Sequence, residues 1–307
     1  MKKIIDIQEF QQFNNLEIIA RHVVEGFITG LHKSPFHGFS VEFAEHRIYN
    51  KGESIKHIDW KLFGKTDKLY VKKYEEETNL RSYIILDNSS SMLFPYRDKK
   101  IDNKLFFSVY CSASLIYLLR KQRDATGLVL FSEDIELFTA AKISSLHSKM
   151  LFTELEKLLS PDKEQLDKKT DLAKALHQVA DKVHKRSLII IFTDLMTSGN
   201  NNDIFSALQH LRFRNHEVIL FHVTDKKREE NFEFQNRPYK FIDMETGEKL
   251  KLNPNFIKED YTRAMADQIR DIKLKCNQFN IDFVFADIND EFSHVLLSYL
   301  IKRKTLF

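Results

Sequence analysis

Cysteine and long apolar runs are scarce in this chain of 307 residues. Its two cysteines, Cys111 and Cys276, cannot form a disulfide framework. Each falls in a predicted helix, as expected of a reduced thiol in a cytoplasmic protein. The first residues lack the apolar segment of a signal peptide, and no run approaches the roughly eighteen apolar residues that a membrane-spanning helix needs. We therefore expect a cytoplasmic protein without a membrane span.

A strong excess of charge is also missing. The chain has 47 Lys and Arg against 44 Asp and Glu, which gives a formal net charge of +3. Such a balance argues neither for nor against nucleic acid. The basic runs at 226–228 and 302–304 lack interleaved aromatic residues and are typical of solvated chain segments. We expect no nucleic-acid partner.

Common catalytic motifs are absent. The 12 histidines are scattered, with no His-Glu-x-x-His, and Gly-x-Ser-x-Gly does not occur. Gly64-Lys65-Thr66 resembles the end of a phosphate loop, but Asp59 stands where the first glycine is required. A phosphatase of the Asp-x-Asp type would need a carboxylate two residues after Asp87, where Ser89 stands. These absences favour a protein that is not an enzyme.

The most informative stretch lies at residues 83–92. Tyr83–Leu86 is an apolar run that predicts a buried strand, and Asp87, Ser89 and Ser91 follow it directly. Alternate side chains of an extended segment point the same way, so these three oxygen-bearing side chains converge. One carboxylate and two hydroxyls suit a hard cation such as Mg²⁺. A serine-rich turn in which Asp87 caps a helix is the alternative that these residues alone leave open.

From residue 83 onward, strand-like runs alternate with helical patterns. The predicted strands are 83–86, 127–131, 135–139, 188–192, 218–223 and 281–285, and the predicted helices are 105–120, 146–159, 170–183, 203–213, 256–278 and 292–301. This alternation predicts an α/β fold with a doubly wound, mostly parallel sheet whose strands are buried. The run 135–139 follows its predecessor too closely for a crossover helix, so it should be an antiparallel edge strand. Residues 232–250 break the rhythm and predict a hairpin that turns at Thr246-Gly247.

The N-terminal region has a different character. Residues 8–31 have the spacing of an amphipathic helix, and 39–49 suggest a strand. The only tryptophan, Trp60, ends a segment that contains Arg47, Tyr49 and Asp59. These four residues form either a docking surface or a structural clasp with a packed Trp60 and an Arg–Asp pair. We expect an extension at 1–78 and an α/β domain at 79–307, with the hairpin excursion at about 228–252.

The succession of a strand, Asp87-x-Ser89-x-Ser91-Met and a long helix resembles the metal-ion-dependent adhesion site of von Willebrand factor A domains. That resemblance implies two further ligands, a Thr and an Asp from later loops. The matching positions are Thr170, which opens a helical pattern, and Asp194, which ends a strand-like run. The implied cofactor is a divalent cation, most simply Mg²⁺, with Mn²⁺ or Ca²⁺ as alternatives.

A wider set of motifs resembles one bacterial family. The motifs are Gly38, Arg47-x-Tyr49-x-x-Gly52, Asp59-Trp60, the Asp87 box, Gln122–Val129, Thr193-Asp194-Leu195 and Phe232-Glu-Phe with Phe241-Ile-Asp-Met-Glu-Thr-Gly. The family is the domain-of-unknown-function fifty-eight family, which contains a von Willebrand factor A-like domain, and the resemblance runs from about residue 16 to 303. Thr193 stands where a Ser is expected. Members are commonly encoded beside MoxR-type AAA+ ATPases, which implies an adaptor or cofactor role for such an ATPase.

Together these observations predict a non-enzymatic, metal-dependent module for protein interaction. An Asp or Glu of the partner would fill an open coordination position on the cation. Two alternatives stay open from the sequence. One is a Mg²⁺-dependent hydrolase or phosphatase that uses the same cation as a Lewis acid. The other is a scaffold whose metal site is vestigial.

Overall fold

The computed structural model describes residues 15–32, 46–49, 60–72, 80–95, 103–160, 168–196, 201–290 and 293–306. The chain divides into two compact units. One consists of residues 28–79, and the other of residues 1–27 together with 80–307. The second unit therefore includes the first part of helix α2 (Leu16–His32), which the sequence assigned to the N-terminal extension.

A six-stranded sheet is the centre of the larger unit. Its strands, in spatial order, are β10 (Asp282–Asp287), β7 (Glu217–Thr224), β6 (Leu188–Thr193), β3 (Arg81–Asp87), β4 (Ala125–Phe131) and β5 (Ile135–Phe138). All neighbours pair in parallel except β4 and β5. Counted from β3, the strand order is 3-2-1-4-5-6, that of a doubly wound sheet. The predicted fold class, including its antiparallel edge strand, is confirmed.

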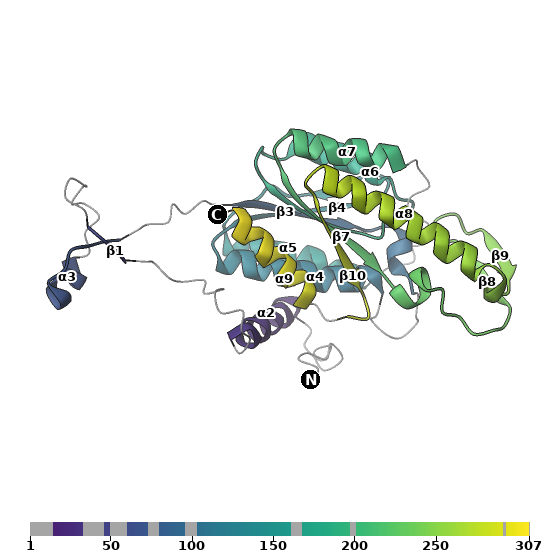
Figure 1. The fold of residues 1–307 in the computed structure, drawn as a ribbon, viewed down its shortest axis with the longest axis horizontal. Coiled ribbons are helices and arrows are strands. Elements are labelled where there is room, and N and C mark those ends of the chain that lie inside the picture. Colours follow the sequence, from purple (N-terminus) through teal and green to yellow (C-terminus); the bar gives the residue numbers. More distant parts are fainter. Residues whose placement is uncertain are drawn as a thin grey trace. The chain divides into compact units, whose positions relative to one another are not determined.

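Helices cover both faces of this sheet (Figure 1). Helices α6 (Leu172–Lys182), α7 (Asn201–Phe213) and α8 (Lys258–Gln278) pack on one face and share a core with alternate residues of β3, β6 and β7. Helices α4 (Lys104–Lys121), α5 (Ser145–Leu158) and α9 (Ser293–Leu306) cover the other. Helix α2 joins that second layer, since Glu17 pairs with Arg120 at 2.7 Å and the backbone N–H of Leu16 donates to Glu156.

The central strands are apolar because both their faces are covered. In β3 every residue after Arg81 is buried, and β4 and β6 are buried throughout. The two cysteines are free and buried in the helical layers. None of the helices within the described ranges is long and apolar enough to cross a membrane.

Strand β10 differs from its prediction. The sequence predicted a buried strand, but β10 pairs only with β7 at one edge of the sheet, and Phe285 is 42% exposed. The last helix also runs further than predicted. The basic residues at its C-terminal end form ion pairs within the protein. Lys302 pairs with Glu217 and Asp282, and Arg303 pairs with Asp124.

Gly127 of β4 permits a close approach between strands. A Cβ atom there would lie 2.7 Å from the carbonyl oxygen of Thr139 and 2.7 Å from a ring carbon of Tyr83. Gly127→Ala should therefore lower the free energy of unfolding by about 1–3 kcal/mol, the usual cost of overpacking. Urea unfolding measures this, with Gly64→Ala as the control, because a Cβ at Gly64 meets nothing within 4 Å. Equal stability of the two variants would contradict this account of β4.

The smaller unit contains a two-stranded antiparallel sheet. Strand β1 (His46–Ile48) pairs with β2 (Tyr70–Lys72), and helix α3 (Trp60–Thr66) lies between them in the chain. Of the segment predicted as a docking surface or clasp, Asp59 and the side chains of Arg47 and Trp60 lie outside the described residues. Residues 8–14 of the predicted first helix and 39–45 of the predicted strand also lie outside them.

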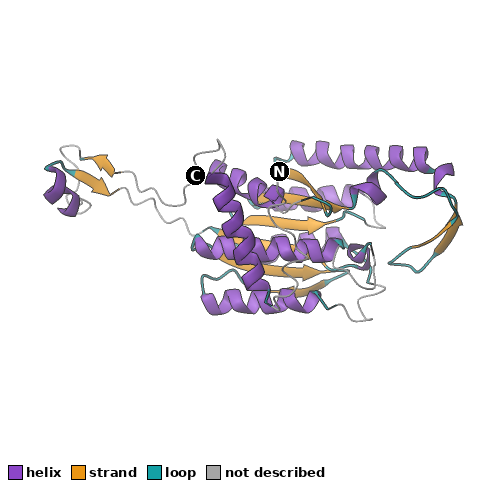
Figure 2. Cartoon of the chain, turned by 90° about the horizontal axis from the view of Figure 1, so that it is seen from below, coloured by secondary structure: helices purple, strands orange, loops and turns teal. Residues whose placement is uncertain are grey.

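The predicted hairpin excursion is present between β7 and α8. It begins with the single helical turn η4 (Lys226–Glu230), continues through strands β8 (Tyr239–Ile242) and β9 (Lys249–Leu252), and ends with η5 (Pro254–Phe256). Strands β8 and β9 pair with each other alone. Figure 2 shows this hairpin on the side of the sheet toward which the strand arrows point.

Candidate metal site at the carboxyl edge of the sheet

The predicted site residues lie at the switch point of the sheet. The chain leaves β3 toward β4 on one side and returns to β6 on the other, so the strand order reverses between β3 and β6. Ligands of doubly wound sheets bind in the crevice outside the carboxyl ends of such strands. Asp87 is the last residue of β3, and Asp194 follows the last residue of β6. Both lie at this crevice.

Asp87 is fully buried and surrounded by donors. Its Oδ1 accepts hydrogen bonds from the backbone N–H of Ser89 at 3.0 Å and from the hydroxyl of Thr170 at 3.3 Å. Its Oδ2 accepts from the hydroxyl of Thr193 at 2.7 Å. The structure thus brings Thr170 to Asp87 from 83 residues further along the chain. It also gives Thr193 a direct contact with Asp87, a role that the sequence did not predict.

Ser89 and Ser91 enter the site from the loop after β3. Ser89 is buried, and its hydroxyl oxygen lies 3.0 Å from that of Ser91, which is only half-buried at the start of η2 (Ser90–Leu93). The predicted convergence of these side chains is therefore present. Because Ser91 is the more exposed of the pair, the site faces solvent on its side.

The loop that delivers Thr170 is tied to the loop after β3. Ser90 and Lys168 exchange two hydrogen bonds, one from each backbone N–H. Lys168 also pairs at 2.8 Å with Glu136, which accepts further hydrogen bonds from Asn88 and Ser132. Although burial opposes it, Lys168 and these two donors hold the pKa of Glu136 below its usual range. This network joins the two loops that carry Ser89, Ser91 and Thr170.

Asp194 is oriented by an unusual backbone conformation. Leu195, directly after it, has a φ of 58°, which costs a non-glycine residue about 1–3 kcal/mol. Hydrogen bonds hold it there: the N–H of Leu195 donates to the Thr193 hydroxyl at 3.1 Å, and the N–H of Met196 donates to Asp194 Oδ1 at 3.0 Å. Strain of this kind is typical of ligand-binding loops.

Lys104 is a member of the site that the sequence did not reveal. It begins α4, its side chain is 1% exposed, and its Nζ donates to Asp194 Oδ2 at 2.7 Å and to Glu229 Oε1 at 2.5 Å. Glu229 comes from η4 and also accepts from the backbone N–H of Asp225. Burial opposes the charge on Lys104, but the two carboxylates outweigh it and raise the pKa of Lys104 above its usual range.

The charges at this edge are poorly compensated. Burial, together with the neighbouring Asp194 carboxylate, raises the pKa of Asp87 to about 6, although hydrogen bonds from Ser89 and Thr193 oppose the change. Lys104 neutralises part of the charge on Asp194 and Glu229, but it makes no hydrogen bond to Asp87 among the described contacts. A buried carboxylate of this kind is stabilised by a nearby cation.

The donor set fits a hard divalent ion. The five predicted ligands are oxygens only, which suits Mg²⁺, Mn²⁺ or Ca²⁺ rather than a softer metal. Two of these ligands are carboxylates and three are hydroxyls, so the predicted site is not a cluster of acidic, histidine or cysteine side chains. No group of three or more such side chains is spaced to hold an ion within the described ranges. Lys104 pairs with Asp194, whereas the hydrogen bonds described for Asp87 come from uncharged donors alone.

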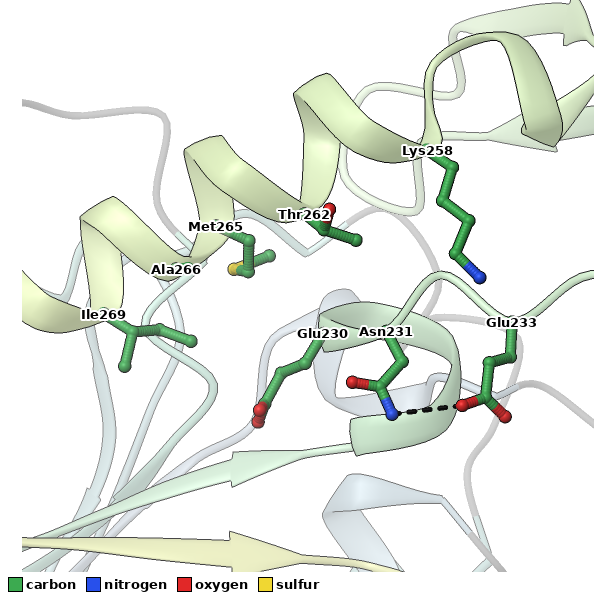
Figure 3. A pocket seen from close by; sticks show the side chains of 8 residues that line it. All are labelled: Glu230, Asn231, Glu233, Lys258, Thr262, Met265, Ala266 and Ile269. Carbon is green, nitrogen blue, oxygen red and sulfur yellow. Dashed lines mark hydrogen bonds between the residues drawn. The ribbon is translucent and has the colours of Figure 1, made fainter.

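A pocket of about 530 Å³ lies between η4 and α8 (Figure 3). Its walls are η4 with the residues after it, which contribute Glu230, Asn231 and Glu233, and one side of α8, which contributes Thr262 and Met265 among others. None of the five predicted ligands lines it. Two consecutive residues of η4 nevertheless contribute to the candidate site and to the pocket. Glu229 binds Lys104, and Glu230 lines the pocket.

A family model described as "Protein of unknown function DUF58" matches residues 45–271, well over half of the chain. The chain belongs to the DUF58 family. The resemblance to this family noted in the sequence is thereby confirmed, and the sheet of this DUF58 member is the doubly wound, mostly parallel one that was predicted.

Relatives of this DUF58 member include two mycobacterial proteins of unassigned function. These are the uncharacterized proteins Rv1480 of Mycobacterium tuberculosis and Mb1516 of Mycobacterium bovis. Each is 20% identical over 257 residues, which cover 84% of this chain and 78% of the relative.

Similar solved structures are more distant. The conserved hypothetical protein BatB from Bacteroides thetaiotaomicron has a TM-score of 0.44 at 13% identity, covering 74% of this chain and all of that one. The SpRpn10 VWA domain has a TM-score of 0.36 at 9% identity, covering 71% of this chain and 93% of that one.

Proposed function

We propose that this DUF58 member is a non-enzymatic module that binds a protein partner through a divalent cation. The observation that carries the proposal is the setting of Asp87, a buried carboxylate at the switch point that faces the hydroxyls of Thr170 and Thr193 and neighbours Asp194. Asp87, Ser89, Ser91, Thr170 and Asp194 would hold the ion. The ion would supply a positive charge and an open coordination position that a carboxylate could fill.

The chemistry of the ligands supports an acidic partner. Asp194 is paired with Lys104, so Asp87 is the main compensating charge for a doubly charged ion. The remaining positive charge would favour an Asp or Glu side chain from outside. As the partner we propose a MoxR-type AAA+ ATPase, on the family resemblance alone. The free, buried cysteines support a cytoplasmic location.

Affinity capture from native cell extract tests this function. Wild type and Asp87→Ala are each used with Mg²⁺ and with EDTA, and Asp203→Ala, which removes an exposed acid of α7, is the charge-matched control. We expect a partner only with wild type and Asp203→Ala in Mg²⁺. An identical catch under all conditions would contradict the metal-bridged interaction. Mg²⁺-dependent turnover of phosphate esters by the purified protein would contradict its non-enzymatic character.

A further inference from the structure

Two histidines from neighbouring helices lie in contact on the face of the sheet that α6, α7 and α8 cover. His177 belongs to α6 and His210 to α7, 33 residues further along the chain. Their Nδ1 atoms are 3.1 Å apart, and their ring centroids are 5.3 Å apart. Both side chains are half-buried. Neither residue is among the five predicted ligands, so the contact between them requires a separate explanation.

The packing of α6 against α7 holds the two histidines in place (Figure 1). Leu176, the residue before His177, is fully buried in the core that the two helices share. Leu211, the residue after His210, is fully buried in the same core. Because both histidines belong to packed helices and not to loops, their Nδ1 atoms are held at a set distance from each other.

The separation of the two Nδ1 atoms suits a shared metal ion. In a tetrahedral zinc site with Zn–N bonds of about 2.0–2.1 Å, two coordinating nitrogens lie about 3.3 Å apart. The observed distance of 3.1 Å is close to this value. In the metal-free pair, one Nδ1 carries a proton and donates it to the other in a hydrogen bond. A bound ion would replace that single proton, since metal ligation requires neutral imidazoles with unprotonated nitrogens.

A carboxylate orients one of the two rings. Asp181 lies four residues after His177 in α6, and its Oδ1 is 3.7 Å from Nε2 of His210. The guanidinium of Arg214 contacts the same oxygen at 2.7 Å. Arg214, with His210 and His177 adding to its effect, holds the pKa of Asp181 below its usual range. An ionised carboxylate beside Nε2 favours a proton on that nitrogen and leaves the Nδ1 lone pair of His210 available to a metal, as in carboxylate–histidine–zinc arrangements.

Imidazole nitrogens select a different class of ion from the oxygen ligands at the carboxyl edge of the sheet. Zn²⁺, Ni²⁺ and Cu²⁺ bind imidazole well, whereas Mg²⁺ prefers oxygen. We propose that His177 and His210 form a second metal site, which binds Zn²⁺ or a chemically similar transition-metal ion and joins α6 to α7. No third acidic, histidine or cysteine side chain is spaced to complete such a site in the described part of the chain, so water fills the other positions. This inference does not depend on the proposed function.

Titration calorimetry of the whole chain with Zn²⁺ tests this site, and excess Mg²⁺ in the buffer keeps Zn²⁺ from the oxygen ligands. Wild type should bind Zn²⁺, and His177→Gln and His210→Gln should each lower the affinity by at least about tenfold. Glutamine retains a hydrogen-bonding side chain of similar size, and circular dichroism checks that both variants are folded. His294→Gln removes an exposed histidine of α9, on the other face of the sheet, and should match wild type.

The electron paramagnetic resonance spectrum with one equivalent of Cu²⁺, which binds such sites more tightly than Zn²⁺, counts the nitrogen ligands. We expect two imidazole nitrogens in wild type and one in either His177→Gln or His210→Gln. Asp87→Ala, which removes a ligand of the other site, should give the wild-type spectrum and the wild-type Zn²⁺ affinity. Loss of Zn²⁺ binding in Asp87→Ala would place the ion at the carboxyl edge and refute the histidine site. Equal Zn²⁺ affinity of wild type and the two histidine variants, or no binding by wild type, would mean that the histidines form a hydrogen bond only.

Discussion

Replacement of Lys104 by methionine is expected to lower the free energy of unfolding by about 3–5 kcal/mol, the cost of breaking a buried ion pair from one side. Methionine keeps most of the length and volume of the side chain but leaves Asp194 and Glu229 buried without their ammonium partner. Urea unfolding followed by circular dichroism, at neutral pH with EDTA, measures the change. The chelator keeps any metal from substituting for the lost charge.

Two controls isolate the buried charge as the cause. Lys157→Met removes an exposed lysine that pairs with Glu154 within α5, and its effect should stay below about 1 kcal/mol. Combining Lys104→Met with Asp194→Asn and Glu229→Gln should recover most of the loss, because no charge is then left unpaired. If the free energy of unfolding of Lys104→Met alone lies within about 1 kcal/mol of that of wild type, Lys104 does not stabilise this edge of the sheet.

Lys104 also has a consequence for how the site works. It connects Asp194, in the loop after β6, with Glu229 of η4, and the next residue of η4 lines the pocket beside α8. The β8–β9 hairpin follows η4 in the chain. Because Asp194 is one of the proposed ligands, Lys104→Met should alter metal affinity as well as stability.

The sheet was predictable from the sequence because its central strands are apolar throughout. The runs Tyr83–Leu86 and Leu188–Phe192 contain only hydrophobic residues. Such continuous runs are typical of strands that are covered on both faces of a sheet. The same criterion failed for β10. The run Ile281–Phe285 is almost as apolar, but its position at the edge depends on pairing with β7 alone, which no local pattern records.

The parts of the site that were missed are those that tertiary contacts define. Lys104 stands near other lysines in a stretch that resembles a solvated surface, and its two partners lie 90 and 125 residues further along the chain. Asp87, Ser89 and Ser91 were predicted from their spacing, whereas Thr170 and Asp194 were predicted from the resemblance to the adhesion site of von Willebrand factor A domains.

The effect of Asp87→Asn should change sign with Mg²⁺. In metal-free protein, the pKa of Asp87 is raised from 3.8 to about 6, so its contribution to stability is complete below pH 3.8 and is lost as the pH rises through 6. At pH 8 the ionised side chain then costs about 2–3 kcal/mol. Asparagine avoids that cost, and the variant in EDTA should be as stable as wild type or more stable. Near pH 4 the difference should disappear, because Asp87 is then protonated.

Saturating Mg²⁺ should reverse the order of the two proteins. An ion present at a thousand times its Kd stabilises the folded state that binds it by about 4.1 kcal/mol, which exceeds the cost of the ionised carboxylate. Wild type should gain this amount at pH 8, while Asp87→Asn, which lacks the directly ligating carboxylate, should gain none. Asp203→Asn, an exposed acid of α7, should follow wild type within about 1 kcal/mol. Thermal unfolding at pH 8 with Mg²⁺ or EDTA measures these differences. If Mg²⁺ stabilises wild type and Asp87→Asn equally, the ion binds elsewhere. If Mg²⁺ stabilises neither protein, the buried carboxylates serve another purpose.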